Sequence, residues 1–162
     1  MTFEDLLLAF LRGAENPLLV GIGNRFRKDD AAGLMVISRL KRKKLKKAIL
    51  MDCGSVPENF TGAIKRLKPT HIIFFDAVEM GQDPGYYSII NEDALGGGSV
   101  STHKQSLRIL FRILQEGIPG VKIALIGIQP KSLDFGKNMT RPVDRGVNSL
   151  VEIMQKVLGC EP

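Results

Sequence analysis

The sequence contains no tryptophan, and aromatic residues make up only 6% of its 162 residues. Proteins that bind single-stranded nucleic acid combine a positively charged groove with aromatic side chains on which the bases stack. The shortage of aromatic residues therefore argues against a nucleic-acid-binding protein.

Cysteines and long hydrophobic runs are also scarce. Cys53 and Cys160 are the only cysteines, and they form neither a CxxC or CxxH metal motif nor a disulfide framework. Apolar runs such as residues 72–75 are far shorter than the roughly 20 residues that cross a bilayer. Acidic residues precede the first short apolar stretch and Arg12 follows it, which is the reverse of a secretory signal peptide. We expect a cytoplasmic protein that does not act on membranes.

Positive charge is concentrated in one place. The net charge is +6, and residues 41–47 (KRKKLKK) contain six basic residues and no acid, so the rest of the chain is formally neutral. Cations at the C-terminal end of a helix interact favourably with its dipole. We therefore interpret this run as a solvated helix end.

Short apolar runs alternate with segments of helical periodicity along the whole chain. The expected strands are residues 17–23, 47–54, 71–79, 86–91 and 122–130, and the expected helices are residues 3–11, 29–44, 58–67, 103–117 and 143–158. Strands of nearly continuous Val, Ile, Leu and Phe that alternate with helices are typical of a parallel sheet buried on both faces. The prediction is a single α/β domain over residues 1–162, a three-layer α/β/α sandwich with a mostly parallel twisted sheet.

Two segments are expected to depart from this regular pattern. The strand at residues 86–91 follows a turn (GQDPG) that is too short for a crossover, so it is predicted to run antiparallel, and against the third strand if the two pair. Residues 1–16 form a helical extension with Phe3, Leu6, Leu7, Phe10 and Leu11 on one face. We expect that face to pack on the domain; docking of a partner is the alternative.

Acidic residues follow three of the predicted strands. Asp29 and Asp30 come after the first strand, Asp52 ends the second, and Asp76 lies near the end of the third. The carboxyl ends of parallel strands share one sheet edge, where ligands bind in open α/β sheets. Carboxylates gathered there would repel one another unless a cation lies among them. These acidic residues therefore predict a metal-binding crevice.

His103 is the candidate nitrogen ligand for this crevice. It opens a predicted helix after the glycine-rich segment GGGSVST, which is flexible enough to bring the imidazole to the same edge. Carboxylate and imidazole together suit nickel, zinc or iron better than magnesium or calcium. Each of Asp30, Asp76 and His103 alone has a structural explanation, but their joint placement favours a functional site.

Other sites are less well supported. The segment GIGN lacks the third glycine of a dinucleotide-binding loop and is followed by the charged residues RFRKDD, which argues against dinucleotide binding. Cys53 is the one candidate thiol nucleophile, although a cysteine at a strand end is more often buried and inert. His71 starts a strand at the opposite edge and is interpreted as structural.

Five motifs, in order, resemble the hydrogenase maturation endopeptidases that trim the C-terminus of a [NiFe]-hydrogenase large subunit. They are GIGNRFRKDDAAG, MDCGSVPENF, IIFFDAVE, GSVSTHKQS and LIGIQPKSL. The resemblance implies that the metal-contacting side chains are Asp30, Asp76 and His103, with Asp30 and Asp76 as the catalytic carboxylates. The residues expected to support the site are Gly21, Gly23, Asn24 and Asp52.

The resemblance also implies a substrate and a source of metal. The substrate would be a [NiFe]-hydrogenase large-subunit precursor, cut once nickel has been loaded. The nickel would come with the precursor, so the free enzyme, expected as a monomer, would hold no metal tightly. The residues before the first strand and the basic run 41–47 depart from the family pattern and leave the partner surface open.

Three alternatives remain at this point. A metal-dependent hydrolase of a small substrate would use the same three residues with a resident ion. A non-catalytic nickel chaperone or docking factor would bind the precursor without cutting it. A cysteine hydrolase would depend on Cys53.

Overall fold

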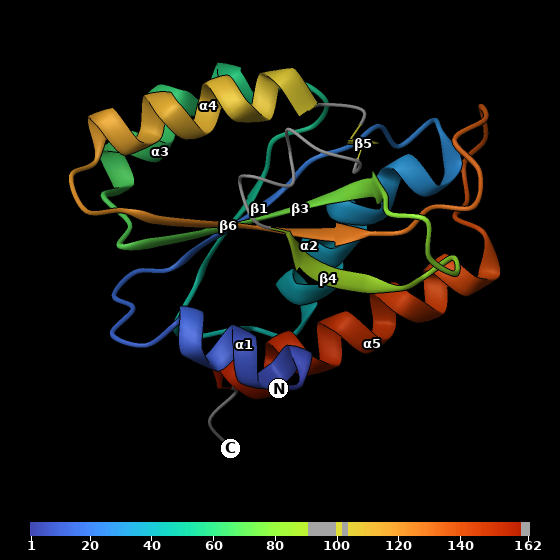
Figure 1. Cartoon of the computed structure of the whole chain (residues 1–162), viewed down its shortest axis with the longest axis horizontal. Helices are drawn as coiled ribbons and strands as arrows, with labels where there is room; N and C mark the ends of the chain where they lie inside the picture. The colour runs from blue at the N-terminus through green and yellow to red at the C-terminus, as the bar shows by residue number, and fades with distance from the viewer. Residues whose placement is uncertain (91–99, 102–103, 160–162) are drawn as a thin grey trace.

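The structure, a computed structural model, describes residues 1–90, 100–101 and 104–159. Its centre is a sheet with the strand order β2-β1-β3-β6-β4. The strands are β1 (Leu18–Gly21), β2 (Ile49–Asp52), β3 (His71–Glu79), β4 (Tyr87–Ile90) and β6 (Lys122–Ile128). The pairs β1–β2, β1–β3 and β3–β6 are parallel, and the arrowheads of β3 and β6 point to the same edge in Figure 1. The predicted mostly parallel sheet is confirmed.

The middle strand β3 explains why the sheet has helices on both faces. Every residue of β3 except Glu79 is buried. Its side chains alternate between two hydrophobic cores, with Ile73 and Phe75 in one and Ile72 and Phe74 in the other. A strand with two buried faces has to be apolar at successive positions, which is the pattern that predicted it.

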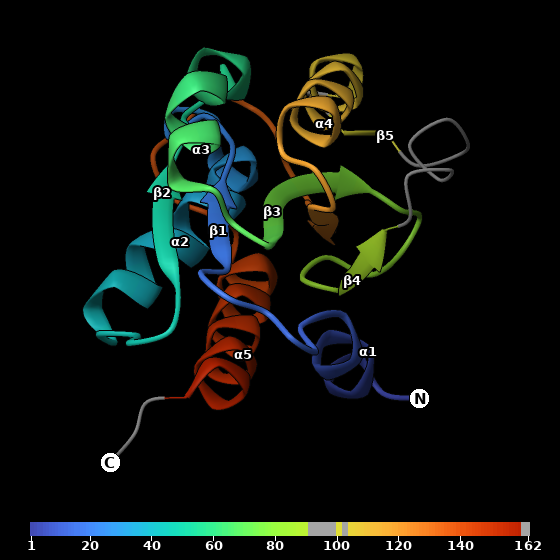
Figure 2. The same cartoon turned by 90° about the vertical axis from the view of Figure 1, so that its left-hand side faces the viewer.

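Helices form a layer on each side of the sheet (Figures 1 and 2). The helices are α1 (Phe3–Phe10), α2 (Ala32–Arg42), α3 (Thr61–Leu67), α4 (Lys104–Gly117) and α5 (Arg141–Leu158), with the 3-10 turns η1 (Lys28–Ala31) and η2 (Pro57–Phe60) before α2 and α3. α1, α2 and α5 bury their apolar residues in the core of Ile73 and Phe75, while α3 and α4 cover the opposite face. The three-layer α/β/α sandwich is therefore as predicted.

The antiparallel strand β4 is present, but its partner is β6. Tyr87–Ile90 pairs with Leu125–Ile128 of β6, so β6 lies between β4 and β3. The short turn after β3 led us to consider β3 as the partner, but that side of β3 is occupied by the parallel strand β6. A further short strand, β5 (Val100–Ser101), pairs antiparallel with Val78 and Glu79 at the end of β3 and was not predicted.

The basic run 41–47 lies at the C-terminal end of α2. Arg39, Lys41 and Arg42 occupy the last turn of that helix, and the basic residues of the run are exposed. α2 starts beside η1 and ends shortly before β2 begins, so the run is far along the helix from Asp30. Among the described residues, no helix is both long enough and apolar enough to cross a membrane.

The N-terminal helix α1 packs on the domain. Leu7 is fully buried, and Phe3, Phe10 and Leu11 pack around the same core. The Phe3 ring meets Tyr87 of β4 edge to face, with the ring centroids 4.9 Å apart. Leu6 was expected on the packed face, but its exposed fraction is 40%. A Thr2–Asp5 capping box starts the helix, with each side chain bonded to the other residue's backbone N–H.

Deleting residues 1–14 should lower the melting temperature by at least about 5 °C. Burial of Leu7 alone is worth about 2 kcal/mol, and each kcal/mol shifts the melting temperature of a domain of this size by about 2–4 °C. Differential scanning calorimetry of the full and shortened chains measures this change. An unchanged melting curve together with lost binding of a partner would show that α1 is a docking element instead.

His71 makes stability depend on pH. The ring is 4% exposed and meets Phe10 edge to face, and its Nδ1 lies 2.8 Å from the Thr70 hydroxyl. Burial, aided by the positive charge of Lys122, lowers the pKa of His71, although the Phe10 backbone opposes this shift. The folded state therefore favours neutral His71, whereas in the unfolded chain the residue titrates near pH 6.5.

The free energy of unfolding should thus fall as the pH drops below about 6.5, because the unfolded chain then binds a proton that the folded chain does not. Denaturant titrations at pH 7.5 and 5.5 measure the loss. The variant His71→Phe should lose less stability than the wild type over this interval. Equal losses in the two proteins would contradict the assignment.

Candidate functional site

Acidic residues do lie at the carboxyl end of the sheet, as predicted. Gly21 at the end of β1 is in register with Asp52 of β2 and with Phe75 of β3, and Asp76 of β3 is in register with Gly127 of β6. Three neighbouring strands therefore bring Asp52, Gly21 and, one residue further along β3, Asp76 to the same end of the sheet. Loops 22–30 and 129–140 leave this edge from β1 and β6.

Asp30 and Asp76 are both buried. Asp76 is fully enclosed, and Asp30, in η1, is 4% exposed. The backbone of Asp30 is fixed on both sides, since its N–H donates to the Arg27 carbonyl at 2.9 Å and its carbonyl accepts from the Asn24 N–H at 3.2 Å. Carboxylates held at low exposure on a rigid backbone are preorganised to bind a cation or to move a proton.

Glycines allow the backbone around Asp30 to pack this closely. A Cβ on Gly23 would lie 2.0 Å from the Asp30 carbonyl oxygen, and one on Gly21 would lie 2.6 Å from the Gly33 carbonyl oxygen. No other residue fits at either position without moving the backbone. Gly21, Gly23 and Asn24 thus all lie against the segment that carries Asp30 and the start of α2.

Gly33 links this segment to the strand that carries Asp76, and the sequence reasoning did not single it out. A Cβ on Gly33 would lie 2.1 Å from the carbonyl oxygen of Phe75, the residue before Asp76. The first turn of α2 therefore touches the β3 backbone directly. This contact places the segment that follows Asp30 against the strand that carries Asp76.

Asp29 has a different role from its neighbour. It is fully buried, and both carboxylate oxygens accept hydrogen bonds from the loop after β6. The donors are the Lys131 N–H (2.9 Å), the Ser132 N–H (2.9 Å), the Thr140 N–H (2.7 Å) and the Thr140 hydroxyl (2.8 Å). The prediction placed Asp29 and Asp30 together at a metal-binding edge; Asp29 instead holds the loop.

Asp52 is the last residue of β2 and lies at the same end of the sheet. It accepts a hydrogen bond from the Gly54 N–H at 2.9 Å and forms an ion pair with Arg25, with a quarter of its side chain exposed. The N–H of the next residue, Cys53, donates to the Gly21 carbonyl. Asp52 thus connects β2 to the loop that follows β1, and Arg25 neutralises much of its charge.

Cys53 is a poor nucleophile in this environment. It is 2% exposed, and burial, together with the adjacent Asp52 carboxylate, raises the pKa of its thiol to about 12. Attack on a substrate needs the thiolate, which is then scarce at neutral pH. The structure therefore disfavours the cysteine-hydrolase alternative.

Gln129, which was not predicted, joins the ends of β3 and β6. It is buried, and its carbonyl oxygen accepts from the Met80 and Gln82 N–H groups, while its amide donates to Glu79 and to the Pro130 carbonyl. The predicted strand 122–130 included Gln129, whereas β6 ends at Ile128, so its position in the motif LIGIQPKSL did not indicate this role. It fixes the loop that continues toward the partners of Asp29.

His103 lies outside the described residues, as do residues 96–99 and 102 of the segment GGGSVST before it. Within the described ranges, no three His, Cys, Asp or Glu side chains come together as a metal-binding group. The described part of the predicted site is thus the two buried residues Asp30 and Asp76. That these two carboxylates and His103 bind one metal ion stays a prediction.

Comparison with known proteins assigns this arrangement to a family. Residues 34–157 match the family model described as hydrogenase maturation protease. The chain is 34% identical to a putative hydrogenase maturation protease of Methanocaldococcus jannaschii, over 95% of this chain and 97% of that protein. It is 31% identical to the hydrogenase 3 maturation protease of Escherichia coli K12, over 85% and 88% of the two chains.

Solved structures show the same fold. A crystal structure of a [NiFe] hydrogenase maturation protease from Thermococcus kodakarensis superimposes with a TM-score of 0.83 at 33% identity, covering 94% of this chain and 98% of that one. The solution structure of an endopeptidase from Escherichia coli superimposes with a TM-score of 0.77 at 29% identity, covering 89% and 92%.

Proposed function

The chain belongs to the hydrogenase maturation protease family and is an endopeptidase, and from this premise we propose that it removes the C-terminal extension of a [NiFe]-hydrogenase large-subunit precursor after nickel loading. The observation that carries this proposal is the burial of Asp30 and Asp76 at one sheet edge, on backbone segments in direct contact through Gly33 and Phe75. We place the reaction in the cytoplasm, with the enzyme acting as a monomer.

Recognition of nickel in the substrate accounts for a protease whose described cysteine, Cys53, is a poor nucleophile. Asp30, Asp76 and His103 offer two carboxylates and one imidazole, a donor set that suits nickel. These side chains would complete the coordination of an ion that the precursor already holds. A precursor without nickel would lack that anchor and would escape cleavage.

Peptide hydrolysis at this site could follow several chemical routes. The metal can polarise the scissile carbonyl, so that water attacks it more readily, or it can activate the attacking water. Alternatively, Asp30 or Asp76 can accept a proton from the attacking water as a general base. In each route Asp29, Gly23 and Gly33 act only by holding the backbone that carries the carboxylates.

Incubation with nickel-loaded and nickel-free precursor tests this function. Mass spectrometry of the precursor should show loss of a C-terminal fragment only in the nickel-loaded sample. Cleavage of both samples at the same rate would contradict nickel recognition. Binding of the loaded precursor without any cleavage would indicate a docking factor.

The metal-dependent hydrolase of a small substrate is distinguished by the purified enzyme itself. That alternative requires a resident ion in about equal amount to the protein, which metal analysis of the protein after dialysis would reveal. Our proposal expects little bound metal and no loss of activity toward nickel-loaded precursor.

A further inference from the structure

Two loops next to Asp30 form one surface. The Lys28 N–H donates to the Gly136 carbonyl at 3.1 Å, and the Gly136 N–H donates to the Phe26 carbonyl at 2.8 Å. The Arg27 guanidinium adds a bond to the Leu133 carbonyl at 3.0 Å. We call residues 24–30 and 131–141 the paired loops. Their backbone contacts, and the hydrogen bonds of Asp29 described above, hold both loops in place.

The paired loops expose mainly positive charge. Their cationic residues are Arg25, Arg27, Lys28, Lys131, Lys137 and Arg141. Of their acidic residues, Asp29 and Asp30 are buried, and only Asp134 is exposed. Lys131, Lys137 and Arg141 form no ion pair with any carboxylate in the described part of the chain. Their charge is therefore available to a partner.

Two aromatic side chains of the paired loops are exposed to solvent. Phe26 is 69% exposed and Phe135 is 81% exposed, and the Arg27 guanidinium lies 5.3 Å from the centre of the Phe135 ring. Large exposed aromatic side chains beside arginine are typical of the residues that dominate protein–protein binding energy. In a chain with so few aromatic residues, their position next to the buried carboxylates points to contact with the protein substrate.

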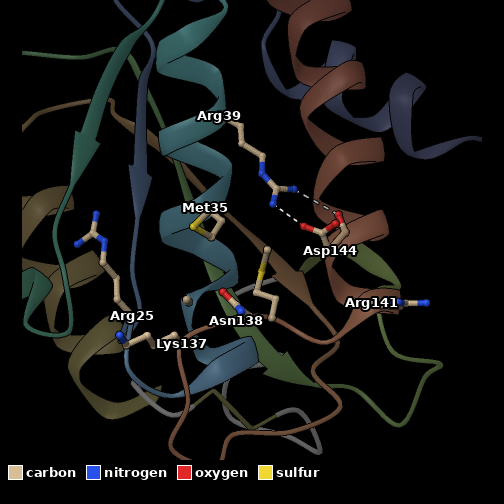
Figure 3. A pocket seen from close by; sticks show the side chains of 9 residues that line it. Arg25, Met35, Arg39, Lys137, Asn138, Arg141 and Asp144 are labelled. Atoms are coloured by element: carbon tan, nitrogen blue, oxygen red, sulfur yellow. Dashed lines mark hydrogen bonds and ion pairs between the residues drawn. The ribbon is translucent and has the colours of Figure 1, made fainter.

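A cavity of about 350 Å³ opens beside these loops (Figure 3). Met35, Met139 and Ala31, the residue after Asp30, contribute apolar surface, and Asn138 contributes an amide. Methionine side chains adapt to apolar groups of different shape. Arg25 and Lys137 lie on one side of the cavity in Figure 3, and Arg39, paired with Asp144, lies on the other. The cavity thus offers an apolar centre with a cationic rim.

We propose that the paired loops and this cavity dock an acidic segment of the large-subunit precursor, with one apolar side chain of that segment in the cavity. This inference rests on the proposed function, because that function identifies a folded protein as the substrate. The occupant follows from charge complementarity. Lys137 and Arg141 line the cavity without an ion pair in the described part of the chain, and the acidic groups of the loops are buried or few. Docking here places the precursor directly beside Asp30.

A pair of charge-reversal variants with equal change in net charge tests the docking surface. The variant Lys137→Glu/Arg141→Glu alters the rim of the cavity, whereas Lys46→Glu/Lys47→Glu alters the basic run beyond the far end of α2. Both pairs are exposed, so neither variant should unfold the protein. Glutamate at the start of α5 even interacts favourably with the helix dipole.

Cleavage kinetics with nickel-loaded precursor should show KM raised about tenfold by Lys137→Glu/Arg141→Glu, with kcat changed little, because rim charges act mainly on encounter and binding. Raising the salt concentration should increase KM of the wild type more than KM of this variant. Phe135→Ala should also raise KM, by about tenfold, if the ring contacts the precursor. Lys46→Glu/Lys47→Glu should stay within about twofold of the wild type.

Equal KM values for the wild type and Lys137→Glu/Arg141→Glu would overturn the proposal, as would equal increases in both charge-reversal variants. Direct binding of nickel-loaded precursor separates this result from failure of the proposed function. Binding that depends on Lys137 and Arg141 without any cleavage would retain the docking surface and reject the protease function. If the surface bound a single-stranded oligonucleotide and not the precursor, the proposal would be wrong.

Discussion

Replacing Asp30 by asparagine should reduce cleavage of nickel-loaded precursor by at least about 100-fold, while the melting temperature stays close to that of the wild type. Asparagine keeps the shape of the side chain but removes the negative charge that would bind the metal. Metal-derived stabilisation of a transition state amounts to several kcal/mol, and each 1.36 kcal/mol changes the rate about tenfold. Asp76→Asn and His103→Ala should cause losses of the same kind.

Asp52→Asn is the matched control for this prediction. Asp52 lies at the same sheet edge, but it is partly exposed and paired with Arg25. Its substitution removes an equal charge outside the proposed metal-binding set, so part of the activity should remain. Full nickel-dependent cleavage by Asp30→Asn and His103→Ala would refute the assignment, and so would equal losses in Asp30→Asn and Asp52→Asn.

Asp29→Asn should act on stability. It should lower the free energy of unfolding by roughly 3 kcal/mol, or the melting temperature by about 6–12 °C. All partners of Asp29 are donors, so both of its oxygens must accept hydrogen bonds. An asparagine has one accepting oxygen, and its NH₂ group would face at least one of these N–H donors whichever way the amide is turned. A buried donor is then left without an acceptor.

Thermal and denaturant unfolding of Asp29→Asn and Asp30→Asn, measured side by side, test this contrast. The two variants change neighbouring residues by the same chemical step, so each controls for the other. A melting temperature of Asp29→Asn within about 2 °C of the wild type would show that the loop after β6 does not depend on this carboxylate. A fall of the same size in Asp30→Asn would show that Asp30 is structural as well.

The sequence alone determined the layers of the fold and the edge at which the candidate site lies. Apolar periodicity is a local property, and a strand such as His71–Glu79, buried on both faces, has to show it at successive positions. In a parallel sheet all strands end at the same edge, so the position of an acid after a strand is sufficient to place it there. For this reason Asp30, Asp52 and Asp76 could be located without coordinates.

Tertiary structure alone decided which partners the residues at that edge meet. Asp29 and Asp30 are indistinguishable by residue type, and only the approach of residues 131–140, about a hundred positions later, assigns hydrogen-bond donors to Asp29. The pairing of β4 with β6 and the contact between Gly33 and Phe75 likewise join segments remote in sequence. Such contacts depend on how the whole chain packs, so they cannot be predicted from periodicity or motif spacing.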